Sequence, residues 1–195
     1  MLAEEKKQML YQELMDTNLE YEGIFKNNFL KSSWIETPLG PMLAIANDES
    51  LYFLEFVDWK GLNQEIEKLR FKTKSTIIPG RCIPIQSIEK ELALYFNGTL
   101  KEFKTPLHLF GTPFQRLVWN ALTKIPYGET KSYSDQASSI NKPSAFRAVA
   151  NANGVNKIAI VIPCHRIINN NGKLGGYGGG IWRKQWLIDH ERKNK

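Results

Sequence analysis

The sequence predicts an α+β protein of two parts, because the secondary-structure pattern and the charge both change near residue 110. Runs that suit strands alternate with amphipathic helical patterns over the first hundred residues, and from Thr112 onward the signals are mostly helical. Residues 1–109 hold 13 Lys and Arg against 16 Asp and Glu, a net charge of −3, whereas residues 110–195 hold 13 against 4, a net charge of +9. We therefore expect an α/β domain over residues 1–107 and a basic helical domain over residues 108–195.

The first part is expected to carry strands and helices after a helical extension within residues 1–30, whose role the sequence leaves open. This extension, over residues 3–20, is polar and amphipathic, with Met9, Leu10 and Leu14 on one side. Strands, turns and helices follow from period-2 and period-3.6 patterns. The expected strands lie within residues 34–46, on either side of a Pro-Gly turn, and at 51–57 and 76–78; the expected helices lie at 61–71 and 84–96.

The second part begins with a helix over about residues 112–125, capped by Thr112 with Pro113 at its first position. A short helix at 134–139, a turn at 141–143 and a further helix at 144–152 then follow. Two short helices joined by a tight turn are typical of a helix-turn-helix, although helix pairs are common in any bundle. In a segment this basic, the pair favours a nucleic-acid partner.

Composition excludes several classes of protein. No apolar run is long enough to span a membrane, and the polar N-terminus does not resemble a signal peptide, so we expect a cytoplasmic protein that does not bind membranes. Two cysteines and three histidines, widely dispersed, are too few for a disulfide scaffold or a structural zinc site. We expect no metal and no cofactor.

The candidate reactive residues lie directly after the apolar run Ile158–Ile162, in the segment Pro163-Cys164-His165-Arg166. A thiol reacts as its thiolate, and neighbouring cationic or proton-accepting groups increase the thiolate fraction. A free cysteine is more often a small buried apolar residue. Burying His and Arg beside it without purpose would be costly, which favours a nucleophile.

The segment Ile160-Val-Ile-Pro-Cys-His-Arg-Ile167 resembles the active-site signature of the O6-alkylguanine-DNA alkyltransferases. Further segments resemble the same family in order and spacing. They are Gly111–Trp119, Ile125–Tyr133, Arg147–Ala152, Gly176–Gly179 and Lys184–Glu191. The resemblance implies a small ribonuclease-H-like α/β N-terminal domain, a winged-helix-like second domain, and stoichiometric transfer of an alkyl group from O6 of guanine, and also O4 of thymine, to the protein. The family's prolines near Lys157 and Ala159, and the zinc ligands of some members, are absent here.

The resemblance also implies roles for individual residues. Cys164 would accept the alkyl group, and His165 would draw away its proton through a bridging water. Glu191 would hold the histidine tautomer, Tyr133 would donate to the departing guanine, and Asn156 would be a hinge. Three residues would line the substrate pocket: Pro163, Tyr177 and Gly179. Without the resemblance, Glu191 would be read as a surface acid, Tyr133 as a packing aromatic, Asn156 as a turn residue and the glycine-rich stretch as a flexible loop.

The partner would be double-stranded DNA containing O6-alkylguanine, bound by a monomer. A base inside a duplex is unreachable, so it must be flipped out. Arg147 would fill the gap that the base leaves, and the small side chains of Ala148 and Ala152 would allow close approach to the DNA backbone.

Three alternatives remain open from the sequence. A non-catalytic alkyltransferase-like lesion-binding protein would resemble this chain but lack the reactive cysteine. A Cys-His hydrolase would not explain the basic helical half. A transcription regulator would leave the thiol unexplained.

Overall fold

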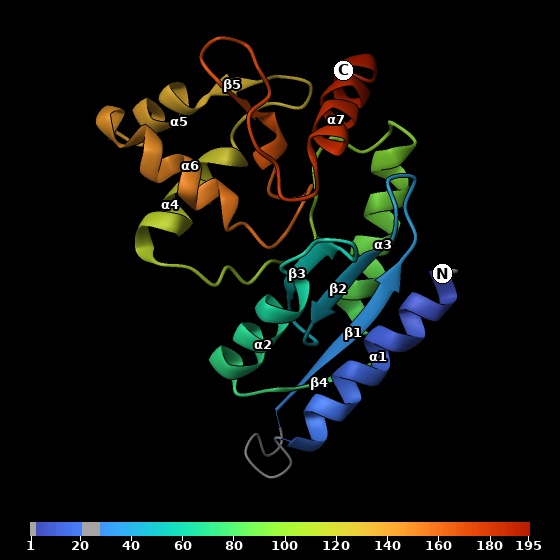
Figure 1. Ribbon diagram of the computed structural model, residues 1–195. Helices are drawn as coiled ribbons and strands as arrows, with labels where there is room; N and C mark the ends of the chain where they lie inside the picture. The colour runs from blue at the N-terminus through green and yellow to red at the C-terminus, as the bar shows by residue number, and fades with distance from the viewer. Residues whose placement is uncertain (1–2, 21–27) are drawn as a thin grey trace. The chain divides into compact units, whose positions relative to one another are not determined.

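The computed structural model describes residues 3–20 and 28–195, which form two compact units (Figure 1). The first unit runs to Glu89 and includes Thr105–Leu107, and the second comprises Lys90–Lys104 and His108–Lys195. Helix α3 (Ile83–Phe96) passes from one unit to the other, so that its last two turns pack with the second unit.

The first unit is built on a four-stranded mixed sheet of order β3-β2-β1-β4 (Figure 1). Its strands are β1 (Phe29–Ile35), β2 (Met42–Ala46), β3 (Leu51–Phe56) and β4 (Thr76–Pro79). The first three pair antiparallel in chain order, and β4 lies parallel to β1. A parallel neighbour needs a crossover, which helix α2 (Leu62–Thr73) supplies between β3 and β4.

The expected strands and helices of this unit are all present, but β1 starts at Phe29 rather than at Trp34. Lys31, Ser32 and Ser33 interrupt the apolar pattern that would otherwise announce a strand. Ser32 is nonetheless fully buried, because its hydroxyl donates to the Ile78 carbonyl at 3.1 Å. A satisfied hydroxyl can therefore occupy the core without an apolar signal.

Helix α1 (Ala3–Glu20) packs beside the edge strand β4 (Figure 1). Leu10 and Leu14, one turn apart, are buried, whereas Met9 is 55% exposed, so its predicted place on the inner face was wrong. Consecutive helical residues point about 100° apart, so Met9 turns away from the face that Leu10 and Leu14 define. The Tyr11 hydroxyl accepts a hydrogen bond from the Trp34 backbone N–H at 3.1 Å.

The second unit is mostly helical, as expected. Its long elements are α4 (Pro113–Leu122), α5 (Tyr133–Ser139), α6 (Phe146–Gly154) and α7 (Ile181–Lys193). Its short elements are the 3-10 turns η1 (Pro143–Ala145) and η2 (Cys164–Arg166), and the parallel pair β5 (Lys131–Ser132) and β6 (Ile167–Ile168). The predicted cap is present: the Thr112 side chain accepts from the Gln115 N–H, with Pro113 in the first turn.

A buried pair of amides joins the two helices of the helix-turn-helix, α5 and α6. Asn153 Nδ2 donates to Gln136 Oε1 at 2.7 Å, and Gln136 Nε2 donates to Asn153 Oδ1 at 3.2 Å and to the Val118 carbonyl of α4 at 3.1 Å. Both side chains are buried, so the pair satisfies groups that would otherwise be costly to bury. It fixes α6 against α5 and α4.

Within the described residues, no helix is both long enough and apolar enough to cross a bilayer.

Candidate active site

The segment that leads to the thiol is buried but irregular. All five residues of Ile158–Ile162 are buried, as the apolar run predicted, yet they form turns rather than a strand. Ile160 has a φ of 70°, an unfavourable conformation for a β-branched residue. Strain of this kind persists only where the surrounding structure imposes it. The strained residue, Ile160, lies four positions before Cys164, the first residue of η2.

Asn156 ties the end of α6 to this segment. Its Oδ1 accepts from the Ile158 N–H at 3.1 Å, and its Nδ2 donates to the Ile162 carbonyl at 3.0 Å. The same Nδ2 lies 3.4 Å from the Sγ of Cys164, which is half-buried and not in a disulfide. An amide N–H directed at sulfur stabilises the thiolate relative to the thiol.

His165 and Glu191 form a fully buried pair, with 2.7 Å between His165 Nε2 and Glu191 Oε1. Burial lowers the pKa of His165 in spite of the opposing effect of Glu191, so the imidazole is neutral at pH 7. A carboxylate only accepts, so Nε2 carries the hydrogen and Nδ1 carries the lone pair. Nδ1 is buried and has no hydrogen-bond partner among the described residues.

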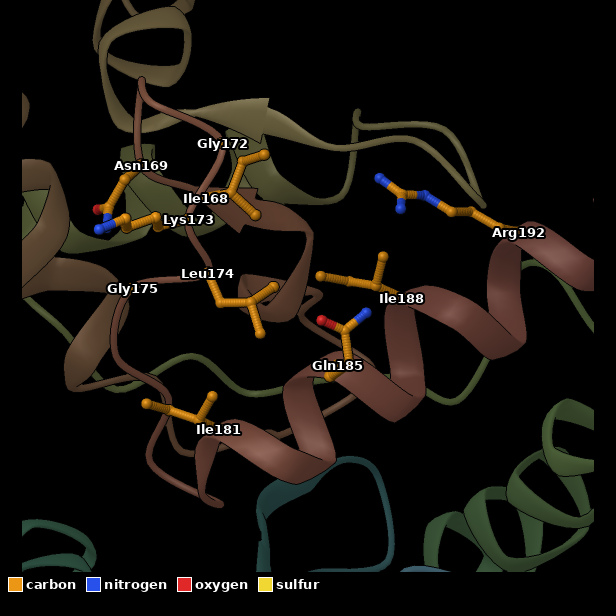
Figure 2. A pocket seen from close by; sticks show the side chains of 10 residues that line it. All are labelled: Ile168, Asn169, Gly172, Lys173, Leu174, Gly175, Ile181, Gln185, Ile188 and Arg192. Atoms are coloured by element: carbon orange, nitrogen blue, oxygen red, sulfur yellow. The ribbon is translucent and has the colours of Figure 1, made fainter.

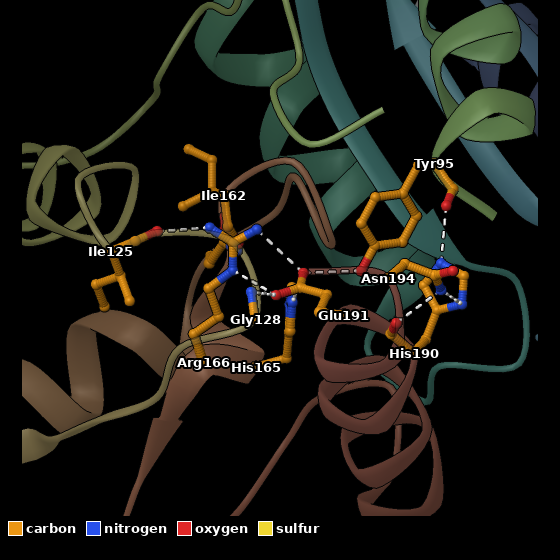
Figure 3. A network of polar contacts seen from close by, with 10 residues as sticks. Tyr95, Ile125, Gly128, Ile162, His165, Arg166, His190, Glu191 and Asn194 are labelled. Carbon is orange, nitrogen blue, oxygen red and sulfur yellow. Dashed lines mark hydrogen bonds and ion pairs between the residues drawn. The ribbon is translucent and has the colours of Figure 1, made fainter. Parts of the chain in front are cut away.

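The Glu191 carboxylate is held by five donated hydrogen bonds (Figure 3). Besides His165, the donors are the Tyr95 hydroxyl at 2.9 Å, the Gly128 N–H at 3.1 Å, and Arg166 through Nε at 2.8 Å and Nη2 at 3.0 Å. Burial would raise the pKa of Glu191, but His165 and Arg166 outweigh it and hold the pKa well below its usual range. The carboxylate is therefore ionised and fixed.

Sequence reasoning did not assign Tyr95, Gly128 or Arg166 to the site. Arg166 belongs to the motif itself, and its burial beside a cysteine was a usable signal. Its Nη1 also donates to the Ile125 carbonyl at 2.7 Å, which secures the guanidinium on two sides. Nothing in the sequence joins Tyr95 to a carboxylate 96 residues later.

Tyr133, the first residue of α5, lies within electrostatic reach of Cys164. Burial and the neighbouring thiol raise the pKa of its hydroxyl, so Tyr133 keeps its hydrogen at neutral pH and can act as a donor. Of the predicted residues, Asn156 and Tyr133 thus interact with the Cys164 thiol, and His165, which follows Cys164 in the chain, pairs with Glu191.

The predicted DNA-contacting residues on α6 divide between its two faces. Arg147 and Ala148 are exposed. Ala152 is only 3% exposed, and its carbonyl accepts a hydrogen bond from the indole of Trp119 at 2.8 Å. The Ala152 methyl therefore belongs to the packing of α6 on α4 and is not presented to a ligand.

The predicted pocket residues come from two segments: Pro163 directly precedes Cys164, and Tyr177 and Gly179 lie in the segment before α7. Pro163 and Gly179 are buried, and Tyr177 is half-buried. Lys184, which sequence reasoning did not select, is fully buried, with its Nζ donating to the carbonyls of Leu174 and Gly176. Burial lowers the pKa of Lys184 to about 8 against an opposing effect of the Cys164 thiol.

In the described residues, no three His, Cys, Asp or Glu side chains gather where they could hold a metal ion.

A thiol backed by a buried His–Glu pair and adjoining a helix-turn-helix defines a nucleic-acid-binding protein with a cysteine nucleophile. Two family models match almost the whole described chain: the ribonuclease-like domain of 6-O-methylguanine DNA methyltransferase over residues 30–109, and its DNA-binding domain over residues 113–193. The chain belongs to the 6-O-methylguanine DNA methyltransferase family.

Individual relatives agree with this assignment. A methylated-DNA–protein-cysteine methyltransferase of Methanosarcina barkeri is 42% identical over 160 residues, which cover 82% of this chain and 96% of the relative. An inducible enzyme of the same name from Bacillus subtilis is 42% identical, covering 75% and 93%. The crystal structure of Mycobacterium tuberculosis OGT in complex with DNA is similar with a TM-score of 0.72 at 40% identity, covering 85% of this chain and 94% of that one. The expected family and fold class are thereby confirmed.

Proposed function

We propose that this protein repairs alkylated DNA by moving an alkyl group from O6 of guanine, and also from O4 of thymine, to Sγ of Cys164. The observation that carries the proposal is that Cys164 is followed in the chain by His165, whose neutral imidazole has its tautomer fixed by Glu191. Membership of the alkyltransferase family supports the substrate.

The reaction is a displacement at the alkyl carbon. The thiol proton passes to the lone pair on Nδ1 of His165, by way of a bridging water in relatives, and the thiolate forms a C–S bond as the C–O6 bond breaks. The electron pair leaves with guanine, which gains a proton, and Tyr133 supplies the donor that neutralises the developing charge. The net change exchanges the thiol hydrogen for the alkyl group. No cofactor enters this balance.

The product is a thioether, which is not a reversible cap, so each molecule acts once. Because the pocket must receive the base alone, the nucleotide is flipped out of the duplex. Arg147 and Ala148, exposed on α6, face the DNA, and Arg147 occupies the space that the base leaves. The protein acts as a monomer in the cytoplasm, with residues 1–107 and 108–195 as its two domains.

The direct test is the intact mass of the protein after incubation with a duplex containing one O6-methylguanine, followed by peptide mapping. We expect one added methyl on Cys164, one restored guanine, and no turnover. Cys164→Ala should abolish transfer and keep DNA binding. Binding by the unaltered protein without an adduct would instead identify a non-catalytic lesion-binding protein.

Base flipping is tested separately with Arg147→Ala. This variant should lose about tenfold or more in transfer from duplex DNA, since the inserted side chain no longer offsets unstacking of a few kcal/mol. Reaction with free O6-benzylguanine should be nearly unchanged. Equal losses on both substrates would refute the insertion role.

A further inference from the structure

The segment between β6 and α7 is poor in side chains that could hold it in place. Residues 174–180 read Leu-Gly-Gly-Tyr-Gly-Gly-Gly, and Gly175 and Gly180 have φ values of 69° and 95°. Glycine loses more backbone entropy on ordering than any other residue and has no side chain to pack. A fixed wall made from this segment therefore needs contacts from elsewhere.

At the start of the segment, side-chain packing against α7 is incomplete. A hollow of about 560 Å³ lies between Leu174 and Gly175 on one side and the face of α7 that carries Ile181, Gln185 and Ile188 on the other (Figure 2). Cys164 does not line this hollow. The glycine-rich segment therefore lies against open space on this side.

What holds the segment is a pair of buried cations in the first turn of α7. Arg183, 5% exposed, donates from Nη1 to the Gly179 carbonyl at 2.8 Å. Lys184, fully buried, donates to the Leu174 carbonyl at 2.5 Å and to the Gly176 carbonyl at 3.2 Å. Hydrogen bonds from charged donors are about twice as strong as neutral ones. Two successive residues thus hold three carbonyls of the segment.

Trp182 completes the arrangement around Arg183. Its ring centroid lies 4.7 Å from the guanidinium carbon, within the range of a cation–π contact. A Cβ placed on Gly180 would meet the same indole at 3.4 Å, so the ring also covers that glycine. Arg183 is therefore enclosed between an indole and the backbone that it binds, and cannot easily turn to another partner.

We infer that Arg183 is a positioning residue that fixes the Gly179 end of the substrate-pocket wall, and thereby limits the size of the alkyl group that the protein accepts. The inference rests on the proposed function, in which Tyr177 and Gly179 line the pocket. Lys184 anchors the other end of the same wall through the carbonyls of Leu174 and Gly176. Loss of the Arg183 contact leaves the Gly179 carbonyl without its charged donor, so the pocket widens and a small substrate is oriented less well.

The test compares single-turnover transfer from two duplexes that differ only in carrying O6-methylguanine or O6-benzylguanine. Arg183→Met keeps an unbranched apolar stem and removes the donors, whereas Arg183→Lys keeps the charge and loses the planar fork. Lys193→Met, which removes an exposed cation from the same helix, is the matched control. Arg183→Met should lower methyl transfer and raise the benzyl-to-methyl rate ratio about tenfold, as loss of one charge-assisted hydrogen bond allows. The benzyl-to-methyl rate ratio of Arg183→Lys should lie between those of Arg183→Met and the unaltered protein. The ratio of Lys193→Met should equal that of the unaltered protein.

An unchanged benzyl-to-methyl ratio in the Arg183 variants would overturn the inference, whether both rates fall together or neither falls. If Arg183→Met does not fold, the rate ratio of Arg183→Lys decides the test, because this variant keeps a buried cation at the position. Absence of any transfer by the unaltered protein would refute the proposed function instead, so the two failures are distinguishable.

Discussion

The reaction proposed for Cys164 requires a proton acceptor that is neutral when the thiol loses its proton. His165 meets this condition because burial lowers its pKa, and because the ionised Glu191 accepts from Nε2 and leaves the lone pair on Nδ1. Arg166 and Tyr95 keep the carboxylate from turning away. The His–Glu pair is thus one part of a larger buried network that serves a single ring nitrogen.

The pH dependence of transfer follows from this network. Below its pKa, His165 is protonated and cannot accept the thiol proton, so the rate should fall on the acid side. Since the folded-state pKa lies below the ordinary value of 6.5, the midpoint of that fall should lie below 6.5. Single-turnover rates between about pH 5 and 8 measure it. DNA binding by Cys164→Ala over the same range is the control, and a midpoint at or above 6.5 would contradict a neutral buried histidine.

Glu191→Gln should be strongly destabilising although it is nearly isosteric. The amide leaves the Arg166 charge without its counterion in a buried site, which costs about 3–5 kcal/mol in the free energy of unfolding. The carboxylate has a depressed folded-state pKa, so its contribution is complete above the ordinary carboxyl range and is lost only as pH falls below it.

Urea denaturation at pH 7 measures the loss in the Glu191→Gln variant. Asp189→Asn, an exposed acid on the same helix, is the matched control and should change stability little. A loss no larger than that of the control would show that the buried network is not stabilising.

At this scale, sequence reasoning selected the residues that are proposed to react and missed those that hold them. Cys164 and His165 adjoin each other in a motif, so their chemistry is visible locally. Tyr95, Gly128 and the burial of Lys184 depend on contacts between distant segments, which no local pattern encodes. Ala152 was misplaced because small residues look alike in sequence whether they pack inside or face a ligand.

At the scale of elements, the helices and strands followed their patterns wherever apolar residues marked the inner face. The first residues of β1 were not predicted as strand, because the buried serines among them do not contribute to an apolar pattern. The helix-turn-helix was visible as two short helices, but the amide pair of Gln136 and Asn153 was not, since buried polar residues read as surface. Such pairs hold α5 and α6 in register without adding to the hydrophobic pattern.

Helix α1 lies before the start of the matched family model at residue 30, yet it is part of the first unit. The Tyr11 hydroxyl of α1 accepts a hydrogen bond from the Trp34 N–H. Trp34 lies in β1 after Ser32, the last residue of β1 that pairs with β4. Tyr11→Phe should therefore lower the free energy of unfolding by about 1–3 kcal/mol, the cost of a buried donor without a partner.

Urea denaturation checks this expectation, with Gln12→Ala, on the exposed side of α1, as the control. No difference between the two variants would show that α1 is not needed to complete the sheet edge.

At the scale of the whole molecule, charge separates the two halves of the chain more clearly than any single motif does. Residues 110–195 carry a net charge of +9, and residues 1–109 a net charge of −3. A basic half offers a surface for phosphates, whereas an acidic half repels them. The residues of the proposed reaction and the positive charge that attracts DNA phosphates therefore lie in the same half of the chain.

DNA affinity should therefore fall steeply with salt while the chemistry does not. Cations that neutralise phosphates release condensed counterions, so the logarithm of the binding constant should decrease linearly with the logarithm of salt concentration, with a slope of about −0.9 for each phosphate contacted. Fluorescence anisotropy with Cys164→Ala and an unmodified duplex measures the slope. Reaction of the unaltered protein with free O6-benzylguanine, which carries no phosphate, should keep nearly the same rate over that range. If binding were insensitive to salt, contacts between the cations of the basic half and DNA phosphates would not be the main source of affinity.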